Sequence, residues 1–416
     1  MSGEPPPRHD PYAPFRIPAY RRYAVGGIVT RLGTRMQSVA VGWDVYQRTG
    51  EPLALGLVGL AQVIPAVLLA LPAGWLADTF DRRQVVLLSL LAMTLTSAGL
   101  ALQALLGADV WVVYALLTLD AVVGSLGRPA RSSLVPRLVP RSVFPGAVAW
   151  NNSLFQLAGV VGPAVGGFVI AASIPAAYGL AALSSLVFAL LLFRIPEAAG
   201  IADTGTGPAT LSTLFDGIHY LRRTRVLLAI ISLDMFAVLL GGAVYLLPVF
   251  AEDILAVGAE GLGALHAAPA VGALLTALAL AHLPPLARAG RALLLSVAGF
   301  GVATILFGVS VNLYLSLAML FLTGAFDQVS MVVRHTMVQL TTPDAMRGRV
   351  SAVNGVFVSA SNELGGFESG LVAHWFGPVL SVVSGGVGTL IVVAVTAWAS
   401  PQLRRFGSLG EIHTNE

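Results

Sequence analysis

The sequence predicts an all-α integral membrane protein with twelve transmembrane helices in two pseudo-symmetric six-helix bundles. Three observations lead to this fold: the composition, the spacing of the apolar runs and an internal repeat. Of the 416 residues, 56% are hydrophobic and only 11% are charged, whereas roughly 25% of the residues of a soluble domain are charged. Most of the surface therefore cannot face water. A span needs roughly 20 mostly apolar residues, so the chain is long enough for about twelve spans joined by short loops.

Apolar runs separated by short polar stretches give the positions of the expected spans. These are 20–48, 53–77, 84–107, 110–137, 142–172, 174–194, 224–251, 259–283, 290–310, 312–340, 346–375 and 378–400. The stretch after the sixth span is polar and rich in small residues, which predicts a linker between two bundles. The expected domains are a cytoplasmic tail at 1–19, an N-terminal bundle at 20–194, a cytoplasmic linker at 195–222, a C-terminal bundle at 223–402 and a cytoplasmic tail at 403–416.

An internal repeat supports the division into two bundles. Several residues of the fourth and fifth spans recur 203 positions later, in the tenth and eleventh spans. The matched pairs are Arg131 with Arg334, Pro140 with Pro343, Asn151 with Asn354, Gly162 with Gly365, and Gly167 with Gly370. Such matches at one offset indicate a duplicated six-helix unit, as is common in transporters.

The arginines predict the orientation in the membrane. All 24 basic residues are arginine. With the N-terminus in the cytoplasm, nearly all of them fall on the inner side, Arg31 and Arg35 lie within the first span, and Arg48 faces outward. An excess of basic residues in cytoplasmic loops is the usual rule. We therefore expect a multi-pass inner-membrane protein with both termini in the cytoplasm, whose arginines contact lipid headgroups rather than nucleic acid.

Two loop and helix motifs stand out. The turn between the second and third spans carries Gly74, Asp78, Arg82 and Arg83. There, Gly74 would allow close helix approach, and Asp78 would pair with an arginine or cap a helix. A simple membrane-exit turn with inward-facing charges is the alternative interpretation.

The fifth span contains five residues that would form a flat, kinked helix face. They are Gly159, Gly162, Pro163, Gly166 and Gly167. Glycines at helical spacing let another helix approach closely, and proline bends the helix. Ordinary packing of small residues would give the same pattern without any part in transport.

These motifs resemble those of the major facilitator superfamily. The first is similar to its cytoplasmic motif A, except that Thr79 and Asp81 stand where that motif has Arg and Gly. The second is similar to the antiporter motif C of drug–proton exporters. The stretch 342–350 resembles the enterobactin-exporter-like branch, the transmembrane secretion effectors, and the likeness covers roughly residues 15–405. It implies alternating access about a cavity lined by spans one, four, seven and ten.

Ionisable residues inside the spans are costly in lipid and usually face a cavity. On the four spans that the resemblance places around the cavity, the candidates are Arg31, Arg35, Asp44, Asp120, Asp234 and Asp327. We expect Arg31 and Asp120 to form an ion pair, since they lie at similar depth. Glu363 and Glu368 follow in the eleventh span. Burial favours the neutral acid, so one of them is predicted to carry the coupled proton. Hydrogen bonding between helices is the alternative role.

Aromatic and amide side chains near the expected cavity are candidate substrate contacts. They are Trp43, Gln62, Asn151, Gln156, Tyr245, Phe326, Gln328 and Asn362. The histidines are scattered without ligand spacing, so we expect no metal site. No cofactor is expected, the proton gradient being the energy source.

These features predict a proton-coupled exporter of small organic molecules, either siderophore-like or drug-like. An uptake permease or a lipid-handling carrier on the same scaffold is the alternative, and a membrane sensor or scaffold is a distant one. An enzyme is not expected, because no G-x-S-x-G, H-E-x-x-H or P-loop pattern is present. The expected partners are a small-molecule substrate, protons and membrane lipids, without nucleic acid, and the protein is expected to be a monomer.

Overall fold

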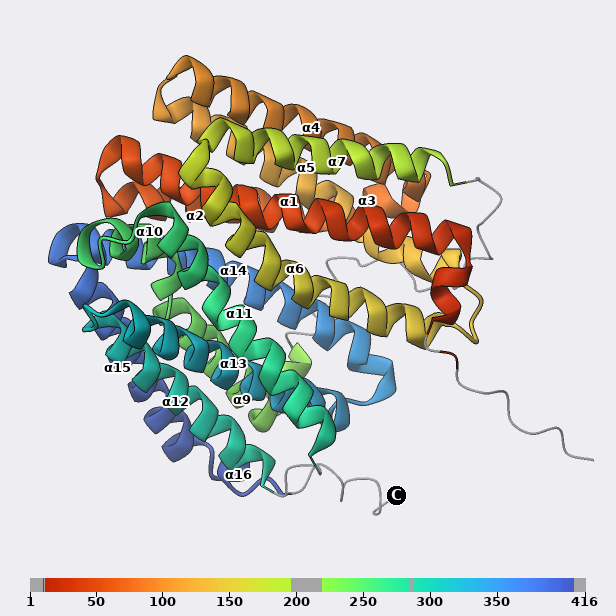
Figure 1. Ribbon diagram of the computed structural model, residues 1–416. Helices are drawn as coiled ribbons and strands as arrows, with labels where there is room; N and C mark the ends of the chain where they lie inside the picture. Colours follow the sequence, from red (N-terminus) through yellow and green to blue (C-terminus); the bar gives the residue numbers. More distant parts are fainter. Residues whose placement is uncertain (1–9, 11, 196–218, 284–287, 408–416) are drawn as a thin grey trace, which may run out of the picture.

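The computed structural model describes residues 10, 12–195, 219–283 and 288–407, which are almost entirely helical (Figure 1). Most of the expected linker, residues 196–218, and parts of both expected tails lie outside the described residues. The first half consists of a short 3₁₀ helix η1 (Ala13–Arg16) and the helices α1 (Pro18–Thr49), α2 (Pro52–Leu68), α3 (Ala70–Thr79), α4 (Arg82–Leu106), α5 (Val110–Leu138), α6 (Phe144–Ala172) and α7 (Ile174–Phe193).

The second half repeats this succession. Its elements are α9 (Arg225–Leu240), the 3₁₀ helix η3 (Ala243–Leu246), α10 (Leu247–Val249), the π-helical turn η4 (Phe250–Ile254), α11 (Gly258–His282), α12 (Ala289–Gly308), α13 (Leu313–Thr341), α14 (Asp344–Phe376), α15 (Pro378–Ala399) and the short α16 (Pro401–Arg404). Adding 203 to the bounds of α5 gives the bounds of α13, and α4, α6 and α7 match α12, α14 and α15 at this offset within a few residues. The internal repeat is therefore present in the structure.

Nine helices of the described chain are long and apolar enough to cross a membrane, and the bent pair formed by α2 and α3 makes a tenth. The prediction of an all-helical membrane protein is confirmed. The helices α1 and α14 have 32 and 33 residues but are more polar than their neighbours. The predicted number of twelve spans depends on these two helices and stays a prediction.

The seventh expected span, 224–251, is present as the apolar segment Val226–Ile254, but its helix is interrupted. It breaks at Gly241 and Gly242 and continues through η3, α10 and η4. A Cβ atom on Gly242 would lie 2.6 Å from the carbonyl oxygen of Gly365, and one on Gly241 would lie 2.7 Å from the Phe300 ring. The break therefore lets the chain pass close to α14 and α12, because glycine leaves room and disfavours a regular helix.

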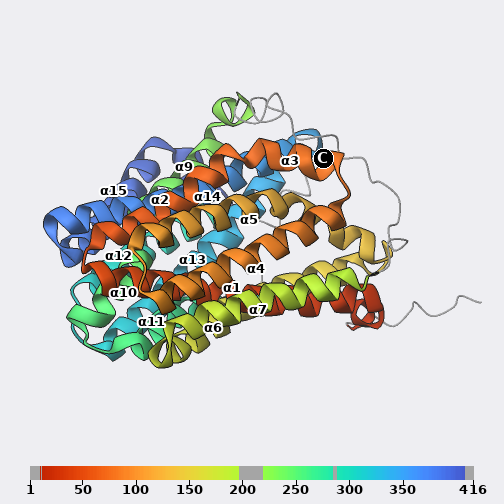
Figure 2. The same cartoon turned by 90° about the horizontal axis from the view of Figure 1, so that it is seen from above.

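The helices of each half pack side by side. In the first half, α7 lies against α1 and α4, while α6 lies against α1 (Figure 2). The two halves meet along two pairs of helices, α6 with α11 and α2 with α14 (Figure 1).

The two ends of the bundle are built differently. We call the end where α1 begins and α15 ends the terminal end, and the opposite end the distal end. At the distal end one hydrophobic core joins both halves, with residues from α1 and α2 packed with residues from α10, η4 and α11. At the terminal end there are two separate cores, one made only of first-half residues and one made only of second-half residues. The halves are thus bound together at the distal end.

Candidate functional site

A cavity of about 230 Å³ lies between the two halves, part-way along the helices. The first half contributes α1 and α6 to its wall, and the second half contributes η3 and α11. The lining residues are Arg35, Phe155, Gln156, Gly159, Pro163, Val244, His266, Pro269, Ala270 and Ala273. Arg35, Gln156, Gly159 and Pro163 were expected from the sequence to be functional, whereas the second-half lining residues were not.

Arg35 is the charged residue on the wall of this cavity. Its guanidinium carbon lies 5.4 Å from the centre of the Phe155 ring, in a cation–π arrangement. Across the gap between the halves, it lies within electrostatic range of Glu363 and Tyr245. The Tyr245 hydroxyl donates a hydrogen bond of 2.9 Å to Glu363 Oε2. A carboxyl group of one half and a guanidinium of the other therefore face the same region.

Glu363 lies at the seam between the halves. Its carbonyl oxygen lies only 2.8 Å from the position that a Cβ atom on Gly59 of α2 would occupy. Arg128 of α5 also lies within electrostatic range of its carboxyl group. The charge of Glu363 therefore acts directly on the first half.

The predicted ion pair between Arg31 and Asp120 is not formed. Arg31 Nη2 instead donates to Asn151 Oδ1 on α6, at 2.8 Å. Asp120 Oδ1 accepts a hydrogen bond of 2.5 Å from the Thr96 hydroxyl on α4. The two residues lie on neighbouring helices, but each points toward a different third helix.

Asp234 forms an ion pair with Arg334, joining α9 to α13. The side chains are only 8% and 10% exposed. Asp234 was expected to face the cavity, and it is instead held inside the second half. Arg334 was interpreted from the sequence as an inner-side charge only.

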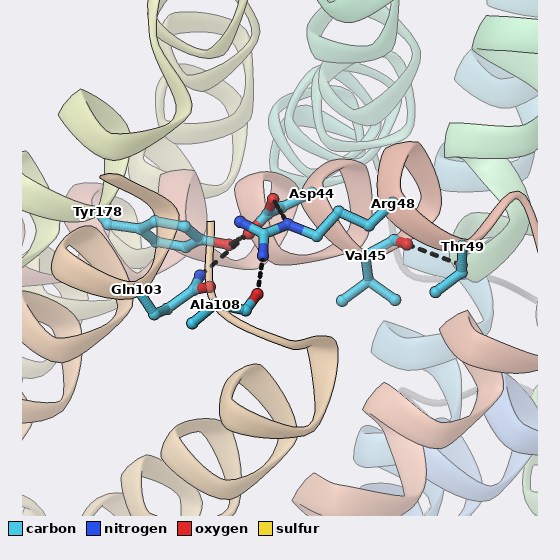
Figure 3. Close-up of polar contacts among 7 residues, drawn as sticks. All are labelled: Asp44, Val45, Arg48, Thr49, Gln103, Ala108 and Tyr178. Atoms are coloured by element: carbon cyan, nitrogen blue, oxygen red, sulfur yellow. Dashed lines mark hydrogen bonds and ion pairs between the residues drawn. The ribbon is translucent and has the colours of Figure 1, made fainter. Parts of the chain in front are cut away.

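Asp44 is not among the residues that line the cavity and lies in a group of polar contacts within the first half (Figure 3). Its carboxylate accepts hydrogen bonds from Arg48 Nε at 2.7 Å, Gln103 Nε2 at 3.2 Å and the Tyr178 hydroxyl at 3.1 Å. Arg48 also donates to the Ala108 carbonyl oxygen at 2.7 Å. These bonds join α1, α4 and α7, so Asp44 is a structural residue of the first half rather than a cavity carboxylate.

Asp327 and Glu368 stay candidates for proton binding. Within the described chain, Asp327 is exposed and makes no hydrogen bond or ion pair. Glu368 is half-buried and accepts a long hydrogen bond of 3.4 Å from the Ser369 hydroxyl.

The loop motif at the terminal end is held by local contacts. Asp78 lies 3.8 Å from Arg82, one helical turn away across the loop. Arg83 Nη2 donates to the Phe193 carbonyl oxygen at 2.7 Å, which joins α4 to α7. Asp81, not Asp78, caps α4. Among the described residues, no atom from outside the adjacent backbone lies within 4 Å of a Cβ atom built on Gly74, so the expected close helix approach at this glycine was wrong.

The glycine face of α6 packs against two helices, as predicted. A Cβ atom on Gly162 would lie 2.6 Å from Arg35 Cβ on α1, and one on Gly167 would lie 2.6 Å from Gly263 Cα on α11. The repeat places Gly370 at the position equivalent to Gly167, and its Cβ atom would lie 2.7 Å from Gly56 Cα on α2. Both seams between the halves therefore consist of closely apposed backbones.

The expected substrate contacts divide into two groups. Gln156 lines the cavity, while Asn151 and Tyr245 hold Arg31 and Glu363 in place. The remaining residues lie elsewhere: Trp43 and Gln328 are buried, the amides of Gln62 and Asn362 donate to carbonyl oxygens of their own helices, and the Phe326 ring packs on Gly299.

Solved structures with the same architecture are membrane transporters. A bacterial homologue of the human lysosomal transporter Spinster, in an inward-facing and occupied conformation, has a TM-score of 0.73 and 14% sequence identity, covering 96% of this chain and 99% of that one. A D-xylose–proton symporter has a TM-score of 0.66 and 14% identity, covering 90% of this chain and 96% of that one. The chain thus has the fold of these transporters, with a cavity between two repeated halves.

A family model matches residues 9–414 and shows that the chain belongs to the transmembrane secretion effectors, a family of major facilitator superfamily transporters and not of enzymes. The enterobactin exporter EntS of Shigella boydii serotype 18 is 29% identical over 395 residues, covering 94% of this chain and 93% of that protein. The enterobactin exporter EntS of Escherichia coli O157:H7 is 28% identical over the same length and coverage. The expected family and superfamily are confirmed, and the chain is a membrane-embedded transporter.

Proposed function

We propose that this chain is a proton-coupled exporter of small organic molecules, with a siderophore-like substrate such as enterobactin, and that it works by alternating access. The exporters that it is similar to along nearly their whole length support the direction of transport. The distribution of arginines supports an orientation in which the terminal end is cytoplasmic, because Arg21, Arg22, Arg82 and Arg83 all lie there.

The observation that carries this proposal is that the two halves, as far as the structure describes the chain, are packed together at the distal end and not at the terminal end. One core joins the halves at the distal end, and separate cores hold each half together at the terminal end. Two polar contacts reinforce the distal junction: the Tyr46 hydroxyl donates to Asp253 Oδ2, and His374 Nδ1 lies 3.0 Å from Glu51 Oε2. Such a molecule is closed toward the outside and can open toward the cytoplasm by moving two intact bodies, as alternating access requires.

Glu363 is the carboxyl group that we propose to carry the proton. It is part of the second half, and the arginines within its electrostatic range, Arg35 and Arg128, belong to the first. Protonation removes its charge and with it the attraction between the halves at this point. A ligand shifts a conformational equilibrium only if it interacts differently with the two states, and a charge that acts across the moving seam meets that condition.

The test uses everted membrane vesicles, in which an exporter moves its substrate into the lumen. We expect vesicles containing this protein to accumulate radiolabelled enterobactin when the lumen is made acidic, and to stop when a protonophore is added. Ethidium serves as a drug-like comparison substrate. Accumulation that a protonophore leaves unchanged would rule out proton coupling, and accumulation of ethidium alone would rule out a siderophore-like substrate.

The Glu363→Gln variant separates coupling from folding. It should lose gradient-driven accumulation but keep the exchange of labelled for unlabelled substrate, which needs no net proton movement. Glu260→Gln makes the same change at an exposed glutamate in the first turn of α11 and, as the matched control, should keep both activities. If Glu363→Gln accumulates substrate like the unmodified protein, another carboxyl group carries the proton.

A further inference from the structure

We infer that the first half carries an anion-binding surface next to the cavity, formed by Arg31, Arg35, Arg128 and Arg131. Its ligand would be a small organic anion that presents a carboxylate or another planar group with two oxygens. That this anion is the transported substrate rests on the proposed function.

The four arginines form a continuous group. Arg131 of α5 lies within electrostatic range of Arg31 on α1 and of Arg128 one helical turn away. Arg128 and Arg35 both lie within electrostatic range of Glu363 across the seam, and Arg35 lines the cavity itself. The group therefore extends from the cavity wall toward the terminal end of the first half.

The guanidinium groups lack charged partners. None of the four forms an ion pair within the part of the chain that the structure describes. Arg31 donates to the neutral Asn151 side chain, and Arg131 Nη2 donates a long hydrogen bond of 3.8 Å to the Met93 sulfur. Arg131 Nε is buried and has no hydrogen-bond acceptor among the described residues. A buried donor without an acceptor is unfavourable and points to a missing ligand.

Nearby carboxyl groups do not balance this charge. Asp120 lies within electrostatic range of Arg131, and Glu363 lies within range of Arg35 and Arg128. Four guanidinium groups thus face two carboxyl groups, each of which already accepts a hydrogen bond from a hydroxyl. Unbalanced positive charge inside a membrane favours the entry of an anion.

In the second half, the arginine equivalent to Arg131 has a carboxylate partner that neutralises its charge. At the offset of 203 residues, Arg334 corresponds to Arg131, and Asp234 corresponds to Arg31. The second half has an acid and a base there, and they form a buried ion pair. The first half has two bases. The arginine at position 31 cannot supply the counter-charge that Asp234 supplies in the second half, and this absence supports binding of an external anion.

The chemistry of arginine fits a planar oxyanion. A guanidinium group presents parallel N–H donors that match the two oxygens of a carboxylate, and it stays charged at every physiological pH. The Phe155 ring beneath Arg35 adds an apolar surface for the body of an organic anion. A neutral compound of the same shape would gain the apolar contact but not the charge-assisted hydrogen bonds.

The test measures binding without any gradient. The full-length protein in phosphatidylcholine nanodiscs is titrated calorimetrically with salicylate and with salicylamide, its uncharged analogue. We expect salicylate to bind at least about tenfold more tightly, as the loss of a charge-assisted hydrogen bond predicts. Equal affinities, or no binding of salicylate, would overturn the inference. Nanodiscs with phosphatidylglycerol distinguish the source of the anion: if this lipid abolishes salicylate binding, the arginines hold a lipid headgroup and the inference is wrong.

The decisive variant is Arg31→Asp, which recreates the arrangement of the second half. It should pair with Arg131, keep the thermal stability of the protein and weaken salicylate binding about ten- to hundredfold. Arg131→Gln should weaken binding comparably without relying on a new pair. Arg16→Asp makes the same charge change at an exposed site and should leave binding unchanged. Unaltered binding in both cavity variants contradicts the inference.

This design separates the two proposals. Salicylate binding that depends on Arg31 and Arg131 would stand even if the vesicles showed no proton-driven transport, in which case only the proposed function fails. Conversely, proton-driven accumulation of enterobactin with unchanged activity in Arg31→Asp and Arg131→Gln would leave the proposed function intact and refute the anion surface.

Discussion

Removing the carboxylate of Asp234 should destabilise the second half strongly. In Asp234→Asn the guanidinium of Arg334 stays buried and loses its counter-charge. Exposed ion pairs contribute about 0–1 kcal/mol to the free energy of unfolding, whereas removing one partner of a buried pair costs about 3–5 kcal/mol. The exposures of 8% and 10% place this pair in the buried class. We therefore expect a loss of about 3–5 kcal/mol.

A double variant tests whether the cause is the unpaired charge. Replacing both partners, with Asp234→Leu and Arg334→Met, removes the two charges together. Such replacements are often neutral or stabilising by about 1–4 kcal/mol, because no charge has to be buried. The double variant should therefore be more stable than either single variant, which gives a large interaction energy in a double-mutant cycle.

Thermal unfolding of the purified protein in detergent, followed by tryptophan fluorescence, measures these differences. A loss of this size should lower the melting temperature on the order of 10 °C. The control is Asp10→Asn, because Asp10 pairs with Arg16 at the surface, where the side chains are 33% and 78% exposed. If Asp234→Asn shifts the melting temperature no more than Asp10→Asn, the assignment of a buried, stabilising pair is refuted.

Three further predictions concern the distal end and the seams. Gly167→Leu should cost about 1–3 kcal/mol by overpacking, because its Cβ atom would lie 2.6 Å from the backbone of α11. Gly179→Leu should not have this cost, because no described residue outside the adjacent backbone lies within 4 Å of its Cβ position; equal melting temperatures of the two variants would contradict the close contact. Asp44→Asn should lose about 1–3 kcal/mol of stability and keep its transport rate per folded molecule. Lost transport with unchanged stability would instead indicate that Asp44 takes part in transport. Glu51→Gln should change the melting temperature by the equivalent of about 1 kcal/mol or less, since its partner His374 is partly exposed; a larger shift would make this contact a main element of the distal junction.

The helices could be predicted from the sequence because lipid imposes a length and a composition on every span. The bounds of α5, α6 and α7 agree with the expected spans within a few residues. The repeat at 203 residues was equally visible, since it depends only on residue identities. The break at Gly241 and Gly242 was missed because glycines are frequent in membrane helices, and the reason for this break is its contact with α14.

The partners of the charged residues could not be predicted, because spacing gives the depth of a residue but not the direction in which it points. Arg31 and Asp120 lie on neighbouring helices, and Asn151 and Thr96 take the places of the predicted partners. The pair formed by Asp234 and Arg334 had a detectable signal in the sequence, because the repeat has an acid, Asp234, at the position equivalent to Arg31. That signal becomes informative only when both halves are superposed.

The crossings at Gly167 and Gly370 have a mechanical consequence. At these crossings the helices touch through backbone atoms, without interlocking side chains. A change in the crossing angle therefore requires no side-chain rearrangement, while the contact keeps the two helices in register. The two crossings occupy equivalent places in the two repeats. They can therefore act as two equivalent pivots between the halves. A methyl group added at one crossing would hinder rotation there and leave the other crossing unchanged.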